Sequence, residues 1–394
     1  MRRPDWATLA AMALVTAIIA GPTFYGLPHG PAAALPTPLV CAGSPGIVLG
    51  ATNVTPQLPD SFSHGSVQAF GSNASSVVFG GVSYYAQHHQ PFDSLPAIGV
   101  VTPSTPSGTD LTPVGGAYFD RGGVFPVVWN GSGWLLAGQT TIGGDSEGSA
   151  VSWTGDRFTN LTPEVGRYFL GEGIWIAGWD GHGWLLGGNS SRGAALVYLS
   201  GSTATDLTPL IPNNAPGDWV QMVGWNGTAW LVGGFGVFGT LSNGRFTDLL
   251  QASPFAEGGV YAIDWNGTSW LVGGSPAVVA SLRGSTLGPP IPALVGASGW
   301  VNAIVALPGN GWIVAGGSYG PGRFDPFAGI VLPGTSRMID ASACLAGAFQ
   351  GGWVQFGAAA PAFGDHAVLL VGEGGTDPRT YESHSAAVEL RVGA

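Results

Sequence analysis

Four acidic side chains stand out as candidates for chemistry because each occupies a similar place in the sequence. They precede a recurring tryptophan by seven to nine residues: Asp120, Glu172, Asp218 and Glu257. Aromatic side chains follow them, namely Phe125, Trp175, Trp219 and Tyr261, and Arg121 adjoins the first acid. Carboxylates and aromatic faces gathered in one concave site can hold a cation, a sugar or a basic peptide.

We therefore assign a candidate ligand-binding set: Asp120, Arg121, Glu172, Trp175, Asp218, Trp219, Glu257 and Tyr261. The alternative interpretation is that the acids solvate loops and that the aromatic residues belong to the core at strand starts.

No catalytic set is recognisable in the sequence. His88 and His89, with Asp93, form the one histidine cluster, but adjacent residues of an extended chain point in opposite directions, so a metal would need ligands from elsewhere. Nucleophile elbows, phosphate-binding loops, EF-hand loops and zinc-ligand spacings are absent from the sequence. We assign no catalytic residue, no metal ligand and no cofactor, with calcium binding left open.

The tryptophan that follows each acid begins a sequence motif that recurs along the chain. Its clear copies are residues 129–138, 179–188, 225–234 and 265–274, and their spacings of 50, 46 and 40 residues are typical of one copied supersecondary unit. Asn-Gly or Asp-Gly between apolar runs predicts a tight hairpin turn. A two-residue turn would pair Trp129 with Ser132, whereas a four-residue loop would pair Trp129 with Trp134. Both pairings put the two indoles on one face, which a neighbouring copy must cover.

Each copy also contains a third and a fourth short apolar run, as in residues 150–153 and 157–163. Four-stranded units repeated at this spacing are typical of β-propeller blades. With weaker copies at both ends, the sequence predicts an all-β fold, a β-propeller of seven four-stranded blades preceded by one N-terminal hydrophobic helix, although six or eight blades also fit. Residues 46–56 resemble a fourth strand and are expected to close the ring by completing the last blade; residues 386–392 are the rival for that place.

The order of these strands resembles the kelch repeat. Gly233-Gly234 and Gly273-Gly274 stand where that family keeps a glycine doublet, Trp153 and Tyr198 stand near its third-strand aromatic residue, and Phe158 and Phe246 stand near its fourth-strand tryptophan. The resemblance implies a propeller fold and does not by itself imply an activity, since kelch-like propellers include binding proteins as well as oxidases and lyases.

Composition and the N-terminus suggest an exported protein. Only 9% of the residues are charged, all twelve cationic residues are arginine, and the net charge of −11 argues against binding nucleic acid through a basic surface. Arg2 and Arg3 precede an uncharged run that is long enough to span a bilayer. We expect residues 1–25 to be a signal-anchor or a cleaved signal peptide, residues 26–45 a Pro/Ala/Gly-rich linker, and residues 46–394 an extracytoplasmic propeller, membrane-anchored or secreted.

The two cysteines, Cys41 and Cys344, lie near the proposed closing strand and the last blade. Export permits a disulfide between them that would clamp the ring, and the alternative is two unpaired buried thiols.

Two main functional hypotheses remain, and a third is a structural cell-envelope component in which the disc only packs laterally. The first is a non-enzymatic propeller that binds a glycan, a peptide or a cell-envelope component through one face. The second is an exported lyase, glycosidase or oxidase with its active site at the channel mouth. Convergence of three or more of the following residues in one pocket would favour the enzyme: Asp120, Glu172, Asp218, Glu257, His64, His88 and Arg121.

Overall fold

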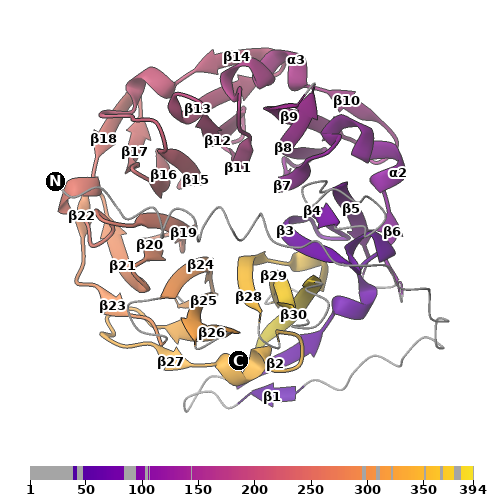
Figure 1. Ribbon diagram of the computed structural model, residues 1–394. Helices are drawn as coiled ribbons and strands as arrows, with labels where there is room; N and C mark the ends of the chain where they lie inside the picture. Colours follow the sequence, from indigo (N-terminus) through magenta and orange to yellow (C-terminus); the bar gives the residue numbers. More distant parts are fainter. Residues whose placement is uncertain are drawn as a thin grey trace.

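The described part of the chain forms seven β-sheet blades around a central axis (Figure 1). Two neighbouring blades join into one nine-stranded sheet through the single residue pair Phe235–Gly259. The structure is a computed structural model, and it describes residues 39–41, 48–83, 95–102, 105, 107–142, 144–294, 299–307, 311–320, 323–349, 352–363, 367–376 and 383–393. The predicted all-β propeller of four-stranded blades, seven in number, is confirmed, with two variations: the fourth strand of blade 5 is split into two short strands, and blade 7 has an additional outer strand. The predicted hydrophobic helix within residues 1–25 lies outside the described residues.

The first four blades follow one another along the chain. Blade 1 contains β3 (Gly65–Ser72), β4 (Val77–Ser83), β5 (Leu95–Val101) and β6 (Thr109–Asp110). Blade 2 contains β7 (Gly123–Trp129), β8 (Trp134–Ile142), β9 (Asp145–Trp153) and β10 (Phe158–Asn160). Blade 3 contains β11 (Ile174–Trp179), β12 (Trp184–Ser190), β13 (Gly193–Ser200) and β14 (Thr203–Asp206). Blade 4 contains β15 (Trp219–Trp225), β16 (Trp230–Phe235), β17 (Phe238–Ser242) and β18 (Arg245–Asp248).

The last three blades show more variation at their outer edges. Blade 5 contains β19 (Gly259–Trp265), β20 (Trp270–Ser275), β21 (Val278–Arg283), β22 (Thr286–Leu287) and β23 (Ile291–Pro292). Blade 6 contains β24 (Gly299–Ala306), β25 (Trp312–Gly320), β26 (Arg323–Val331) and β27 (Ile339–Asp340). Blade 7 contains β28 (Trp353–Ala359), β29 (Ala367–Thr376), β30 (Ser383–Gly393), β2 (Val48–Asn53) and β1 (Leu39–Cys41).

Short helices connect or flank the blades. They are η1 (Thr55–Gln57), η2 (Asp60–Phe62), α2 (Thr112–Gly115), η3 (Gly116–Phe119), α3 (Thr162–Val165), η4 (Gly166–Tyr168), η5 (Thr208–Leu210), η6 (Leu250–Ala252), η7 (Ser342–Leu345) and η8 (Pro361–Phe363).

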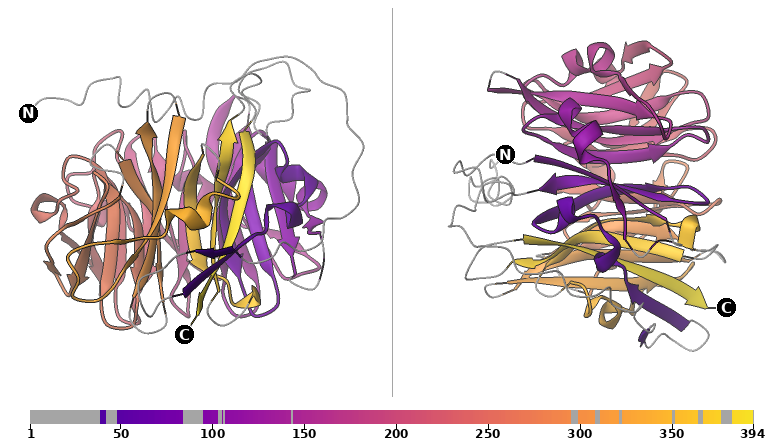
Figure 2. Two further views of the ribbon diagram at one scale, coloured as in Figure 1. Left: turned by 90° about the horizontal axis from the view of Figure 1, so that it is seen from below. Right: turned by 90° about the vertical axis from the view of Figure 1, so that its right-hand side faces the viewer.

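The first strand of each blade is the innermost one. Strands β3, β7, β11, β15, β19, β24 and β28 contact one another in succession around the ring, and β28 returns to contact β3. Figure 2 shows the blades from the side, with their strands running along the axis of the ring. The loops that lead into these strands therefore surround one mouth of the central channel.

The repeated hairpin has the four-residue loop, so the two-residue pairing is wrong. Trp129 lies directly opposite Trp134, and their ring centroids are 4.8 Å apart. The Asn130 side chain explains this register, because its Oδ1 accepts hydrogen bonds from the backbone N–H groups of Ser132 and Gly133 at 2.9 and 2.8 Å. Gly131 has a φ of +96°, a conformation that favours glycine. In a two-residue turn, the Ser132 N–H group would donate to a backbone carbonyl oxygen. Here it donates to the Asn130 side chain instead.

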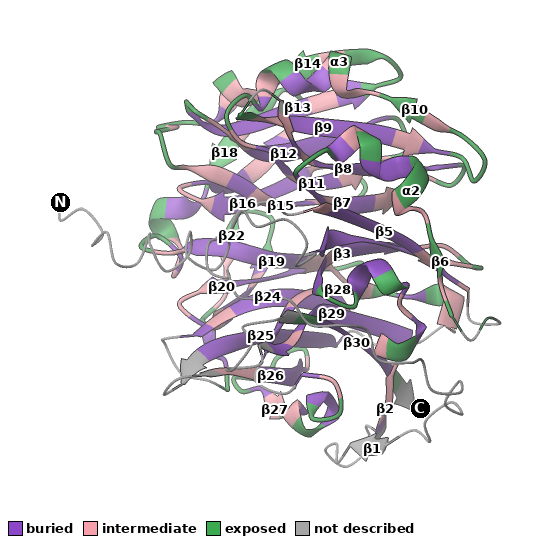
Figure 3. Cartoon of the chain, turned by 45° about the vertical axis from the view of Figure 1, so that its right-hand side comes forward, coloured by how far each residue is buried: buried purple, intermediate pink, exposed green. Residues whose placement is uncertain are grey.

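Only the second indole of each clear pair is fully covered. Trp134 is 4% exposed, whereas Trp129 is half-buried. A Cβ atom on Gly71 of the preceding blade would lie 2.8 Å from the Trp134 ring, so glycine lets the inner strand approach the indole closely. The buried second tryptophan therefore packs between neighbouring blades. Figure 3 shows the wider pattern, with buried residues along the strands and exposed residues at the turns and outer helices.

The ring is closed by the N-terminal strand, as predicted. Strand β2 pairs with β30 as the fourth strand of blade 7. Residues 386–392, the alternative closing strand, instead belong to β30, the third strand of that blade. Thr55 follows β2 and makes two hydrogen bonds with the third strand of the blade. Its Oγ1 accepts a hydrogen bond from Ala387 N at 2.9 Å and donates one to Ala387 O at 3.3 Å. Thr112 makes the same pair of bonds with Ile98 in blade 1. The last blade therefore joins both ends of the described chain.

Strand β1 adds a fifth strand outside β2, within the segment that sequence analysis assigned to the linker. It also contacts η7, the short helix that contains the buried Cys344. The predicted bond between Cys41 and Cys344 stays a prediction. Among the described residues, none of the helices has the length and apolar character needed to cross a membrane.

Candidate functional site

A β-bulge recurs at the same place in every inner strand of the described chain. In each case the ladder between the first and second strands is interrupted after a valine or isoleucine, and the extra residue projects into the channel. The bulge residues are Gln68, Phe125, Trp175, Gln221, Tyr261, Asn302 and Gln355. All seven line one central cavity of about 180 Å³. We call this set the bulge ring.

A glycine on the second strand makes each bulge feasible. Gly234 lies opposite Val220, the residue before bulged Gln221, and a Cβ atom on Gly234 would lie 1.9 Å from the Trp219 carbonyl oxygen. The corresponding distance at Gly274, to Gly259 O, is 1.8 Å. The same close approach occurs in the other blades, at Gly81, Gly138, Gly188, Gly316 and Gly372. In blades 1, 3, 4 and 5 the second glycine of the repeated doublet therefore positions a channel side chain.

The bulge ring combines polar amides with aromatic rings and carries no formal charge. Four members are carboxamides and three are aromatic, and the other described residues that line the cavity are also uncharged. Carboxamides both donate and accept hydrogen bonds, and aromatic faces cover apolar surfaces. Such a cavity suits a ligand that is polar and uncharged.

Neighbouring indoles orient two of the carboxamides. Trp219 Nε1 donates to Gln221 Oε1 at 3.1 Å, and Trp353 Nε1 donates to Gln355 Oε1 at 3.0 Å. An indole N–H only donates, so the amide oxygen must face it and the amide nitrogen is directed elsewhere. Asn302 has the opposite orientation, because its Nδ2 donates to the backbone oxygen of Val354 at 3.1 Å. The ring therefore holds amide groups in fixed and differing orientations.

The aromatic members are also held in place. The Phe125 and Trp175 rings lie 4.5 Å apart, and Trp175 Nε1 donates to Asn189 Oδ1 at 2.6 Å. Burial raises the pKa of Tyr261 to about 12, so its hydroxyl remains a neutral hydrogen-bond donor at physiological pH. The aromatic members of the ring therefore present neutral surfaces to the cavity.

The predicted binding residues divide into three groups. Trp175 and Tyr261 belong to the bulge ring. Trp219 adjoins the ring through its bond to Gln221 and stacks on Phe235 with centroids 4.9 Å apart. The remaining predicted residues, Asp120, Arg121, Glu172, Asp218 and Glu257, do not line the described cavity.

The acids instead form hydrogen bonds with residues near the mouth of the channel or face solvent. Glu172 is hydrogen-bonded to the Asn189 side chain, which links it to Trp175, and burial raises the pKa of Glu172. Asp218 accepts a hydrogen bond from Ala215 N at 2.8 Å, and burial raises its pKa as well. Asp120, Arg121 and Glu257 are exposed.

The convergence that would favour an enzyme is not observed among the described residues. His64 is exposed and lies near His384, with ring centroids 6.3 Å apart, away from the cavity lining. His88, His89 and Asp93 lie outside the described residues. In the parts of the chain that the structure describes, no cluster of three or more histidine, cysteine or acidic residues has the arrangement of a metal site.

The four carboxamides of the bulge ring were not predicted from the sequence. A positional signal was present, because in each of the four clear copies the bulge residue precedes the first hairpin tryptophan by four residues. Glutamine at position 221 of the third copy occupies the place that an aromatic residue holds in the others. Counting back from the hairpin would therefore have found Gln221.

A separate carboxyl group connects blades 5 and 6 at the hairpin end of their inner strands. Asp264 is half-buried on β19 and accepts hydrogen bonds from Trp265 N at 2.8 Å and from Ala306 N of β24 at 2.7 Å. Burial raises its pKa to about 6, and the two backbone hydrogen bonds oppose that shift.

This raised pKa predicts a pH-dependent stability. The folded state binds the proton more readily than the unfolded state, so the free energy of unfolding should fall as pH rises from the ordinary pKa of 3.8 to about 6. We expect Asp264→Asn to lack this contribution, so that wild type loses stability relative to the variant between about pH 4 and pH 7. Urea unfolding of both proteins across this range measures the difference; a constant difference, or one that changes in the opposite direction, would contradict the assignment.

Comparison with known proteins supports the fold alone. No protein-family model and no curated protein matches the sequence. Among solved structures, the chain is similar to the WD40 β-propeller domain of Doa1, with a TM-score of 0.51 and 10% identity over 83% of this chain and 97% of that one. It is similar to Chaetomium thermophilum Sqt1 bound to the N-terminus of ribosomal protein L10, with a TM-score of 0.50 and 13% identity over 85% and 98%.

A third similar structure is the extracellular domain of the one component system BT4673 from B. thetaiotaomicron, with a TM-score of 0.52 and 12% identity over 84% of this chain and 39% of that one. The chain is a β-propeller. One of these neighbours is a WD40 domain, so the similarity shows the propeller architecture without the finer kelch assignment.

Proposed function

We propose that this chain is a non-enzymatic binding propeller whose channel recognises an uncharged polar ligand, either a neutral glycan or a peptide segment. The observation that carries the proposal is the bulge ring, in which seven repeated bulges present four carboxamides and three aromatic rings to one cavity. Amides bind the hydroxyl groups of a sugar or the backbone of a peptide, and aromatic faces cover its apolar parts.

The chemistry of the lining favours binding over hydrolysis. Glycoside hydrolysis generally uses two carboxylates that flank the scissile bond. None of the acids predicted from the sequence lines the described cavity, and the best-placed of them, Glu172, acts through Asn189 on Trp175. Sqt1, whose fold is similar, was solved bound to the N-terminus of a ribosomal protein, which supports a peptide as one of the two ligand classes.

We further propose that the propeller works outside the cytoplasm, anchored in the membrane or secreted, without a cofactor, and that its blades are kelch-like. Arg2 and Arg3 ahead of a long uncharged run support export. The glycine doublets at positions 233–234 and 273–274 support the kelch-like assignment, since the second glycine of each accommodates the bulge.

Glycan and peptide arrays probed with the full-length protein, with and without calcium, test the binding proposal. A neutral glycan or a peptide should bind, and Trp175→Ala should weaken that binding about tenfold or more because it removes an aromatic face of the cavity. Trp179→Ala is the matched control, because Trp179 lies on the same strand outside the cavity lining. Equal losses in the two variants, or exclusive binding of charged ligands, would refute the channel as the binding site.

A further inference from the structure

A second cavity lies between blades 3 and 4, away from the channel. Its volume is about 290 Å³, and its walls come from the outer strands of blade 3 and from the two hairpin ends of blade 4. Tyr198 and Thr205 contribute from blade 3, and Trp225, Thr228 and Asn243 contribute from blade 4. The hairpin turns lie at the opposite end of the inner strands from the loops that surround the bulge ring. We call this cavity the interblade groove.

Tyr198 makes this junction unlike those between the other clear copies. It lies opposite Leu185 on the neighbouring strand, and the residues at the same register in blades 2, 4 and 5 are the small side chains Ser152, Thr240 and Ser281. The tyrosine ring lies across the hairpin turn of its own blade, where a Cβ atom on Gly183 would lie 2.6 Å from the ring.

The tyrosine is also fixed by a substitution in that turn. Its hydroxyl donates to Asp180 Oδ2 at 2.9 Å, and Asp180 replaces the asparagine that the other three copies carry at this position. Burial, this hydrogen bond and the charge of Asp180 raise the pKa of Tyr198 to about 12, so the ring remains neutral. Two residues specific to this blade therefore act together to hold one aromatic wall of the groove.

The lining of the interblade groove joins aromatic surface with uncharged polar groups. Tyr198 and Trp225 are half-buried, so part of each ring remains accessible, and half-buried Leu207 and buried Leu241 add aliphatic surface. Thr205, Thr228 and Asn243 are exposed at the rim and offer hydroxyl and amide groups. None of the described lining residues is charged, and the net charge of −11 disfavours an anionic ligand.

We propose that the interblade groove is a binding site for a neutral sugar ring. A sugar ring has an apolar C–H face that packs on aromatic side chains, and hydroxyl groups around its edge that both donate and accept hydrogen bonds. The groove provides these partners in the same arrangement, with aromatic and aliphatic surface inside and hydroxyl and amide groups at the rim. This site is independent of the bulge ring, so it stands whether the channel binds a glycan, a peptide or neither.

Isothermal titration of the full-length protein with glucose, galactose, mannose and N-acetylglucosamine tests the proposal, with glucuronate as the charged probe. At least one neutral sugar should bind with a dissociation constant of about 1 mM, as expected for a small site with few contacts, and more tightly than glucuronate. Tyr198→Ser should weaken that binding about tenfold, because it removes one aromatic wall. This variant introduces the residue that blades 2 and 5 carry at the same register, so the blade should fold.

Two further variants separate this groove from other tryptophan-containing sites. Trp225→Ala should weaken sugar binding about tenfold or more, whereas Trp265→Ala, which truncates the corresponding half-buried tryptophan of the next blade, should leave it unchanged. The proposal is overturned if none of the four neutral sugars binds, if Tyr198→Ser binds as tightly as wild type, or if Trp265→Ala reduces binding as much as Trp225→Ala.

Discussion

Gly274→Ala is expected to lower the free energy of unfolding by about 3 kcal/mol, because the added methyl group would overlap the backbone of the inner strand. Its Cβ would lie 1.8 Å from Gly259 O and 2.9 Å from the carbonyl carbon of the same residue. These are backbone atoms of a paired strand, so relief requires the bulge at Tyr261 to move. Urea unfolding monitored by tryptophan fluorescence measures the loss.

Gly50→Ala is the matched control for this substitution. Gly50 also lies within a strand, β2, but an added Cβ there would have no neighbour within 4 Å. Alanine is at least as favourable as glycine within a strand, so this variant should unfold at the same urea concentration as wild type or at a slightly higher one. If Gly274→Ala were as stable as Gly50→Ala, the close approach that underlies the bulge ring would not exist in the protein.

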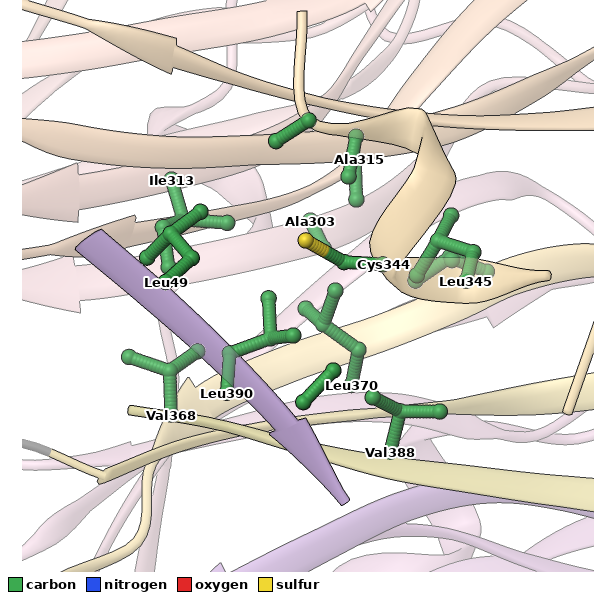
Figure 4. Packing of buried hydrophobic residues seen from close by; sticks show 14 of the residues in the cluster. Leu49, Ala303, Ile313, Ala315, Cys344, Leu345, Val368, Leu370, Val388 and Leu390 are labelled. Carbon is green, nitrogen blue, oxygen red and sulfur yellow. The ribbon is translucent and has the colours of Figure 1, made fainter. Parts of the chain in front are cut away.

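Leu49→Ala is expected to lower the free energy of unfolding by about 3 kcal/mol, because it leaves a cavity where the ring closes. Leu49 is 1% exposed on β2 and belongs to a buried cluster with Ile313 of blade 6 and Val368 and Leu390 of blade 7. Figure 4 shows Leu49 on β2 among these side chains. Since β2 comes from the N-terminal part of the described chain and pairs with the C-terminal strand β30, the lost packing weakens the contact that joins the two ends of the described chain.

Leu170→Ala removes the same atoms from a surface position. Leu170 is 51% exposed, so its truncation should change the free energy of unfolding by less than about 0.5 kcal/mol. Urea denaturation of the two variants in parallel separates packing at the closure from a general effect of losing leucine. A Leu49→Ala protein as stable as Leu170→Ala would mean that β2 does not seal the ring in solution.

The blades were predictable from the sequence because the residues that define them are copied. The hairpin tryptophans, the turn asparagines and the glycine doublets recur in register, and each has a local role in a turn, a strand or a close contact. The closing strand was predictable for the same reason, since Asn53 and Thr55 repeat a motif present after other fourth strands. The loop length was harder to predict, because the Asn130 side chain makes bonds that a shorter turn would make with backbone atoms.

The channel lining was only partly predictable because it depends on bulges. Alternation along an unbroken strand directs side chains toward the neighbouring blades, and one extra residue turns a side chain away from that pattern. Trp175 and Tyr261 were found because aromatic residues recur near the strand starts, whereas Gln68, Asn302 and Gln355 lie in weaker copies without the tryptophan pair. The acids were conspicuous in sequence because they recur, yet the loops place them around the mouth and outside the cavity lining.

The most direct test of the channel as a binding site is the NMR response of side-chain amides. Protein labelled with ¹⁵N at glutamine and asparagine side chains would be titrated with the neutral glycan or peptide that binds on the arrays. We expect the amide signals of the bulge ring to shift, namely those of Gln68, Gln221, Asn302 and Gln355, while the exposed Asn213 and Gln251 keep their positions. A bound ligand that leaves all four bulge-ring signals unchanged would contradict the account.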